Sequence, residues 1–259
     1  MTNAKLETIQ SLNKFLANLE KNSVFENDYF KLLSEEEWSP TTYEFFRANF
    51  FYRTELTVKG IANTCARSAA ENDMDTLILF SYILGEETGM GEKARCHEIF
   101  MEKALNLFGS VEYGLPELRV QEAKNSSLIL PETIAYREKI HELITGDYPR
   151  MLGVMMALET HADIMLTAFR NAFRLSRNKL DKERYLNQVE IYFNSHIDNG
   201  VEERHAEDAT KCVVNNCSSK EDYDEIVYGA LEAFKVQESM WQAMYQRSLT
   251  FEGLENSEA

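Results

Sequence analysis

The stretch from Tyr148 to about Phe173 constrains the fold more than any other, because its apolar side chains recur with a helical period and a carboxylate lies among them. Glu159 occupies the centre of an apolar stripe formed by Leu152, Met155, Ala162, Leu166 and Phe169. This pattern predicts a long helix whose stripe faces a core. A buried, unpaired carboxylate costs roughly several kcal/mol, so Glu159 in a core implies a bound cation, an arginine partner or a raised pKa.

Helical periodicity extends over most of the chain. Ser39 and Pro40 are typical of an N-cap and a first helical position, and Ser219 with Asp222 three residues later resembles a capping box. Gly109 is expected to close the helix that precedes it. The expected helices span about 2–19, 40–69, 73–88, 92–108, 131–145, 148–173, 181–195, 200–214 and 220–249, with one short helix at most in the connection at 110–130.

These helices, without any strand pattern or repeat, indicate one all-α domain over residues 1–259 with a disordered tail at 252–259. The 27 basic and 43 acidic residues give a net charge of −16, which disfavours nucleic acid or a membrane as partner because phosphate binding needs clustered Lys and Arg. No uncharged apolar run of about 18 residues occurs, and the N-terminus lacks the apolar core of a signal peptide. We therefore expect a cytoplasmic protein.

A second informative stretch runs from Tyr192 to Glu207 and combines two of the five histidines with several acidic residues. Glu202 and His205 are three apart, so on a helix both project from one face and can reach one metal ion. Asp198, four residues before Glu202, shares that face. His196 continues a different stripe, which faces a core and is formed by Tyr185, Val189 and Tyr192. The alternative is an exposed acidic helix junction with two incidental histidines.

Two further candidates flank a glycine pair. A stripe ending at Leu84 leads to Glu87, and His97 follows ten residues later, across Gly89-Met90-Gly91. On one straight helix Glu87 and His97 would point about 80° apart, whereas the glycine break makes convergence feasible. Judged alone, Glu87 could instead face solvent beside Glu86.

Six residues on at least four expected helices thus provide mixed nitrogen and oxygen donors: Glu87, His97, Glu159, His196, Glu202 and His205. Such a set favours iron or manganese, whereas a structural zinc site would recruit cysteine. His141 and His161 lack such company and are expected at the surface or behind the ligands. The cysteines show no C-x-x-C spacing and are expected to be free thiols: Cys65, Cys96, Cys212 and Cys217.

The sequence from Ser81 to Gly91, followed by His97 and Leu107-Phe108-Gly109, resembles the segment of the haem-oxygenase-like di-iron oxidases in which a glutamate, a Gly-x-Gly turn and a histidine supply ligands. Ala157-Leu158-Glu159 is similar to the next ligand glutamate of that family. Tyr192-Phe193-x-x-His196 is similar to the motif that opens its final ligand helix. The resemblance covers roughly residues 40 to 245.

This resemblance implies a haem-oxygenase-like bundle of seven to eight helices without haem. It also implies two Fe(II) ions per chain, with manganese as the alternative metal, and O2 as co-substrate. The reactions of that family are N-oxygenation, desaturation or C–C cleavage of amino-acid- or fatty-acid-like molecules. We expect a small-molecule substrate and a homodimer.

One departure from the family pattern concerns the last ligand helix. The family usually has His-x3-Asp-x2-His there, whereas His196 and His205 are nine apart, two more than expected. Either His196 keeps its role and a bulge near Asn199-Gly200 absorbs the extra residues, or Asp198 takes the place of the histidine. The aromatic anchor before His196 favours the first register, and helical phase favours the second. Glu55 is an alternate additional carboxylate ligand.

The leading functional hypothesis is an O2-dependent oxidase or oxygenase. The alternatives on the same fold are a metal-free enzyme of cofactor metabolism and a non-catalytic binding protein. A thiaminase-like hydrolase or a cofactorless oxidase like the pyrroloquinoline-quinone synthase would exemplify the former, using a nucleophilic cysteine or polar side chains. The sequence does not rank the basic residues that could hold an acidic group of the substrate: Arg47, Arg53, Lys59, Arg67 and Arg170.

Overall fold

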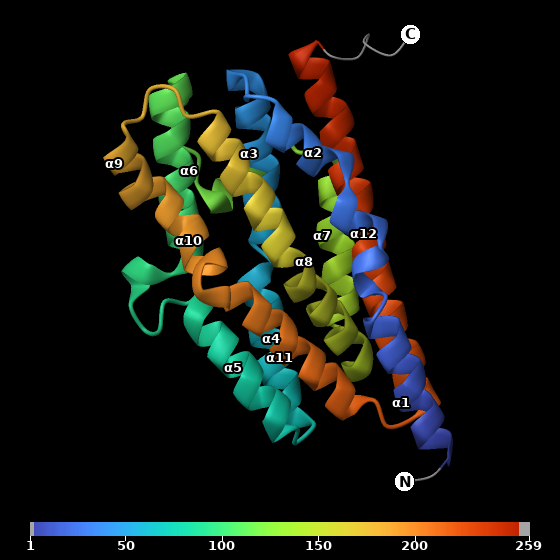
Figure 1. Cartoon of the computed structure of the whole chain (residues 1–259). Helices are drawn as coiled ribbons and strands as arrows, with labels where there is room; N and C mark the ends of the chain where they lie inside the picture. The colour runs from blue at the N-terminus through green and yellow to red at the C-terminus, as the bar shows by residue number, and fades with distance from the viewer. Residues whose placement is uncertain (1–2, 254–259) are drawn as a thin grey trace.

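The computed structural model describes residues 3–253, and of residues 3–5 and 199 it describes the backbone alone. This part of the chain contains helices and turns and no strand, so the predicted all-α class is confirmed (Figure 1). The first α-helices are α1 (Asn3–Leu16), α2 (Asp28–Glu35), α3 (Pro40–Thr54), α4 (Thr57–Ala70), α5 (Met74–Glu87) and α6 (His97–Tyr113). The others are α7 (Pro131–Ile144), α8 (Tyr148–Leu175), α9 (Lys182–Tyr185), α10 (Ile191–Ile197), α11 (Val201–Asn216) and α12 (Lys220–Glu252).

Shorter turns connect several of these helices. Five are of the 3-10 type, at Leu19–Lys21, Ser23–Glu26, Lys93–Arg95, Val120–Asn125 and Asp198–Gly200, and one π-helical turn spans Leu186–Glu190. The capping box of Ser219 and Asp222 is present at the start of α12. Glu252, placed at the start of the expected tail, is the last residue of α12. The rest of that tail, from residue 254, lies outside the described residues.

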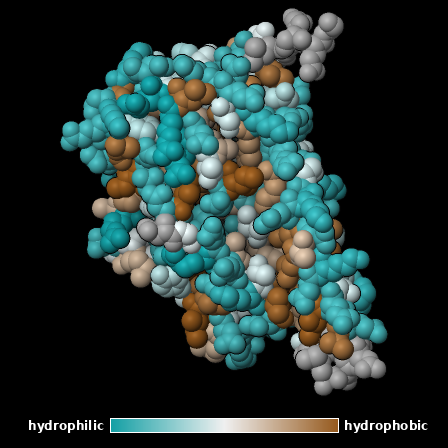
Figure 2. All heavy atoms as spheres, viewed as in Figure 1, coloured by the Kyte–Doolittle hydropathy of each residue, from teal (hydrophilic) through white to brown (hydrophobic). Residues whose placement is uncertain are grey.

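The central helix is α8, which packs against α12, α11, α2, α7, α10 and α4. Figure 1 shows it running through the middle of the bundle, with α12 along one side. Its length and composition would suffice to cross a membrane, but 67% of its most apolar window is buried inside the bundle, as in the core helix of a globular protein. The face in Figure 2 is mostly hydrophilic with scattered apolar residues, which is normal for a protein surface.

Two glycines allow the close crossing of α8 and α12. A Cβ on Gly153 of α8 would lie 2.1 Å from the carbonyl oxygen of Ile226, and one on Gly229 of α12 would lie 2.3 Å from that of Arg150. Both distances are far below van der Waals contact, so only glycine fits at these positions. This contact fixes the position of the helix that carries Glu159.

The single long helix expected after Ser39 is divided into α3 and α4, so that prediction is wrong in its extent. Ser39 does cap α3 as expected. Arg137 of α7 donates hydrogen bonds to the carbonyl oxygen of Tyr52 and, at 2.6 Å, to Oε2 of Glu55. The Tyr52 carbonyl is the acceptor that a continuous helix would use for the amide four residues on. A side chain from a distant helix thus competes with the helical hydrogen bond at the break.

Helix α6 begins later and ends later than expected, at His97 and Tyr113 rather than near 92 and 108. Gly109 does not end it. A Cβ on Gly109 would lie 2.7 Å from the ring of Tyr43, so this glycine permits close packing of α6 on α3. Gly114, with φ of 71°, supplies the left-handed cap that ends the helix.

The N-terminal segment covers one face of the core. The sequence patterns predict no element between 20 and 38, but α2 lies there and packs on α8 and α12. Phe25 and Phe30 contact the ring of His161, each at 5.7 Å between centroids, and Trp241 stacks on the same ring at 6.3 Å. His161 is fully buried, which together with the charge of Arg53 lowers its pKa to about 3. His161 is therefore not at the surface, because a neutral imidazole packs like an aromatic ring, whereas His141 is exposed, as expected.

Candidate metal centre

The six donors predicted from the sequence lie on five helices and converge in the interior. Glu87 is the last residue of α5 and His97 the first of α6, Glu159 lies midway along α8, His196 lies on α10, and Glu202 and His205 lie on α11. All six are at most 9% exposed. The structure arranges them as two groups of three, in each of which the donor atoms lie within 4.8 Å of one another.

The first group, called triad A here, consists of Glu87, His97 and His196. Oε1 of Glu87 lies 3.1 Å from Nδ1 of His97 and 3.9 Å from Nε2 of His196. The two imidazole rings are 4.2 Å apart between centroids. The turn between Glu87 and His97 makes this possible because Gly89 adopts φ of 77°, and a Cβ there would lie 2.5 Å from a backbone oxygen.

The second group, triad B, consists of Glu159, Glu202 and His205. Nδ1 of His205 lies 3.7 Å from Oε2 of Glu159 and 3.8 Å from Oε2 of Glu202. Glu202 and His205 share one face of α11, as their spacing predicts. Glu159 reaches them from α8, on which α11 packs.

In each triad, one histidine donates a hydrogen bond through the ring nitrogen that points away from the other donors. Nδ1 of His196 donates to the carbonyl oxygen of Tyr192 at 2.8 Å, so the lone pair of the neutral ring is on Nε2, toward Glu87. Burial and the charge of His97 lower the pKa of His196 to about 4, which keeps the ring neutral at pH 7. Such outer hydrogen bonds orient histidine ligands and fix their tautomer.

The three carboxylates of the site carry no Lys or Arg partner within the described chain; their ion-pair partners are histidines. Burial, with the charge of Glu87 adding to it, raises the pKa of Glu159 to about 8. Burial and the charges of Glu159 and Glu87 raise the pKa of Glu202 well above its usual range. For Glu87, burial is outweighed by the hydrogen bond and charge of His97, so its pKa is lowered. Closely spaced buried carboxylates of this kind are compensated by a bound cation or by protons.

The two alternate ligands lie apart from both triads. Asp198 is exposed and faces Arg170 at 3.4 Å, and Glu55 pairs with Arg137 and with Lys59. The chain leaves the helix at Asp198, which is extended, and returns through Gly200 in the left-handed conformation. The two extra residues are therefore absorbed by a break between α10 and α11 rather than by a bulge within one helix. The break rotates Asp198 away and leaves His196 and His205 pointing inward.

Residues 45–238 match the sequence model of a family described as iron-containing redox enzymes. The chain belongs to this family. No curated protein matches the chain.

Two of the solved structures that match this chain share its fold. One is a CADD-like protein of unknown function from Nostoc punctiforme, 16% identical, covering 95% of this chain and 96% of its own, with a TM-score of 0.67. The other is a domain of unknown function with a haem oxygenase-like fold from Shewanella denitrificans, 16% identical, covering 100% of this chain and 98% of its own, with a TM-score of 0.59. The predicted haem-oxygenase-like fold is thereby confirmed.

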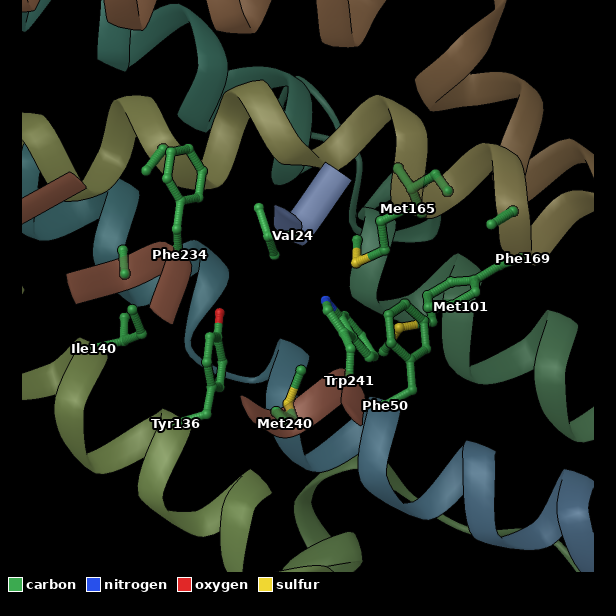
Figure 3. Close-up of a cluster of buried hydrophobic side chains, with 14 of the residues drawn as sticks. Val24, Phe50, Met101, Tyr136, Ile140, Met165, Phe169, Phe234, Met240 and Trp241 are labelled. Carbon is green, nitrogen blue, oxygen red and sulfur yellow. The ribbon is translucent and has the colours of Figure 1, made fainter. Parts of the chain in front are cut away.

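A cavity opens beside the two triads. Its volume is about 90 Å³, and five of the six donors line it, His205 being the exception. Most of its remaining wall is apolar or aromatic and includes Phe50, Met101, Ile140, Met155, Met165 and Leu166. Figure 3 shows Phe50, Met101 and Met165 together at one end of this interior, projecting from three different helices. A small apolar molecule could therefore contact the donors away from bulk water.

Sequence reasoning missed one residue near the centre, Glu86, and it named a second, Tyr192, only as part of the aromatic anchor before His196. Glu86 accepts a hydrogen bond from Nε2 of His205 at 2.8 Å, although its neighbour Glu87 enters the other triad. Tyr192 lines the cavity and holds His196 through its carbonyl oxygen. The tandem Glu86-Glu87 at a helix end was the available signal for the first, and it was weighed only as a sign of solvent exposure.

Proposed function

We propose that the chain is an O2-dependent oxidase or oxygenase that holds two Fe(II) ions, one in each triad, and acts on a small amino-acid- or fatty-acid-like molecule. The observation that carries this proposal is the pair of buried triads with mixed nitrogen and oxygen donors at the wall of one apolar cavity. Six donors exceed the need of one octahedral ion that keeps positions free for O2. Bound iron would supply the electrons for reduction of O2, and manganese is the alternative metal.

The protein residues have separate tasks in this proposal. Glu87, His97 and His196 would hold one ion, and Glu159, Glu202 and His205 the other. In the metal-free chain Glu159, with its pKa at about 8, carries a proton at neutral pH and releases it when a cation binds. The methionines and aromatic rings of the cavity wall exclude water from the reacting molecule.

The cysteine-dependent alternative receives no support from the structure. None of the four cysteines lines the cavity beside the triads. Burial raises the pKa of the Cys65, Cys212 and Cys217 thiols, which disfavours the reactive thiolate. A non-catalytic binding protein could hold metal with the same six donors, and O2 uptake by the iron-loaded chain separates it from the oxidase.

Anaerobic titration with Fe(II), followed by removal of free metal and elemental analysis, tests the proposal. We expect about two iron equivalents per folded chain, and O2 uptake on exposure to air. A correctly folded chain that never retains more than trace iron would contradict the proposal. The homodimer and the cytoplasmic location stay predictions, which analytical ultracentrifugation and cell fractionation would test.

A further inference from the structure

The cavity beside the metal centre contains one buried arginine without a carboxylate partner. Arg53 of α3 is 7% exposed and lines the cavity. Its Nη2 donates to Oε1 of Gln237 at 3.1 Å, whereas its Nε has no acceptor. Within the described chain, no Asp or Glu oxygen lies within 4.0 Å of its guanidinium nitrogens.

Aromatic rings on two sides hold the guanidinium. Its central carbon lies 5.2 Å from the ring centroid of Tyr136 and 5.3 Å from that of Trp241. Figure 3 shows these two side chains projecting from α7 and α12 into the same interior. Cation–π contacts offset part of the desolvation cost of a buried cation, but a buried guanidinium is fully compensated by an anion with two acceptor oxygens.

The other basic residues that could hold an acidic group are engaged elsewhere. Arg47 donates to Asn106, Lys59 pairs with Glu55, Arg67 donates to the carbonyl oxygen of Gly146, and Arg170 pairs with Asp198. None of these four lines the cavity. The structure therefore singles out Arg53 among the five basic residues, which the sequence did not rank.

We propose that Arg53 binds the carboxylate of the substrate in a bidentate manner and that the apolar body of the substrate extends from there toward the triads. This inference rests on the proposed function, because it names the substrate class of the same cavity. One guanidinium, with no second Lys or Arg in the lining, matches one negative charge better than a phosphate monoester.

Arg53 and the triads are carried by different helices. Arg53 and its neighbours Gln237, Tyr136 and Trp241 belong to α3, α7 and α12, whereas every triad residue belongs to α5, α6, α8, α10 or α11. Apolar residues such as Phe50, Met165 and Leu166 line the cavity as well. In this proposal the carboxylate lies at Arg53, and the apolar body extends along this lining toward the triads.

The same lining argues against an α-amino acid anchored at Arg53. The acidic residues of the cavity are the three triad glutamates and Glu98, which lies on α6 next to His97. None of them belongs to α3, α7 or α12, the helices that carry Arg53 and its hydrogen-bond and ring partners. An ammonium group adjacent to the bound carboxylate would have no acidic partner on these three helices. A monocarboxylate without a neighbouring amine fits the cavity best.

Calorimetric titration of the iron-loaded, anaerobic protein tests the proposal with straight-chain carboxylates from butanoate to decanoate. The comparison compounds are the alcohols and the 2-amino acids of equal chain length. We expect one carboxylate to bind about 10–100-fold more tightly than its matching alcohol, the range expected for charged hydrogen bonds, and more tightly than its 2-amino analogue. Trp241 fluorescence gives a local signal, since its ring contacts Arg53. Equal affinity for carboxylate and alcohol in the wild-type protein would overturn the proposal without any variant.

Two variants locate the binding group. Arg53→Met should abolish the preference for the carboxylate, and exchanging a buried charge for an apolar side chain of similar length is often neutral for folding. Arg53→Lys keeps the charge without the planar fork and should give an intermediate affinity. Arg47→Met is the matched control, since Arg47 is a buried arginine on the same helix that does not line the cavity. A carboxylate preference that survives in Arg53→Met would overturn the proposal.

Metal content separates this inference from the proposed function. If the chain binds no iron but shows an Arg53-dependent preference for carboxylates, the proposed function fails and the anchor stands. A second outcome is that the chain binds two irons and that the carboxylate binds only to the iron-loaded form, with equal affinity in Arg53→Met and in the wild type. In that case the carboxylate ligates the metal, and the proposed anchor at Arg53 fails.

Discussion

Nε2 of His205 lies 2.8 Å from a carboxylate oxygen of Glu86, the residue that precedes triad A, while Nδ1 of the same ring faces triad B. A carboxylate only accepts hydrogen bonds, so Nε2 carries the proton and the lone pair is on Nδ1. Glu86 thus orients a residue of triad B from the helix that supplies triad A. The two triads are coupled through adjacent positions of α5.

Glu86→Ala should weaken metal binding about 10–100-fold, the usual effect of losing a carboxylate behind a histidine ligand. The loss should fall on one of the two irons, since His205 belongs to triad B. Competition with a chelator of known affinity measures it. Glu203→Ala is the control, because Glu203 is exposed and acidic but lies outside both triads. Equal affinities in the two variants would show that the Glu86 hydrogen bond has no influence on the metal.

Substitutions at three positions decide the register of the last ligand stretch. His196→Ala should lose iron as severely as His205→Ala, because both rings are buried in a triad. Asp198→Ala should be mild, since its carboxylate is exposed beside Arg170. Elemental analysis after gel filtration gives the ranking. Iron retained by His196→Ala and lost by Asp198→Ala would show that the helical-phase register is correct after all.

The stability that Glu159 contributes to the metal-free protein should be lost as the pH rises from about 4.5 to about 8, most visibly above about pH 6.5, because the lowered pKa values of His161 and His196 act in the opposite direction below that pH. The pKa of Glu159 is raised to about 8 in the folded chain from an unfolded value near 4.5, so the folded state binds more protons in this interval. Stability from this group is complete below about pH 4.5 and is lost as the pH passes through about 8. Urea unfolding at several pH values measures it.

Glu159→Gln should reduce that pH dependence, because the amide does not titrate, while Glu202, whose pKa is also raised by burial, keeps its own contribution. Metal affinity should show the opposite trend and rise with pH over the same range, since a cation displaces the Glu159 proton. A Glu159→Gln protein with the same pH profile as the wild type would assign the effect to another group.

Gly153→Ala should destabilise the fold by about 1–3 kcal/mol or more, because the added Cβ would meet the carbonyl oxygen of Ile226 at 2.1 Å. Thermal and urea unfolding report the loss. Gly60→Ala is the comparison, since its nearest new contact is the flexible sulfur of Met155 at 3.4 Å. We expect Gly60→Ala to be close to neutral, and equal losses in the two variants would contradict this account of the α8–α12 crossing.

Sequence periodicity by itself determined the helical class, most helix positions and the six donor residues. Helical phase is a local property, so an apolar stripe leading to Glu159 or Glu87 already indicates that a carboxylate faces the interior. The caps at Ser39 and Ser219 are likewise set by side chains within four residues of the helix start. What these residues bind stays a proposal.

Tertiary packing alone decided the features that depend on distant partners. The break between α3 and α4 coincides with hydrogen bonds from Arg137, which is more than eighty residues away. The rotation of Asp198 out of the site follows from a backbone turn that periodicity treats as continuous helix. The hydrogen bond of Glu86 was not predicted, and Arg53 was one of five unranked basic candidates, because sequence periodicity does not show the surroundings of a charged side chain. Whether a charge lies in water or in a cavity depends on helices joined only by folding.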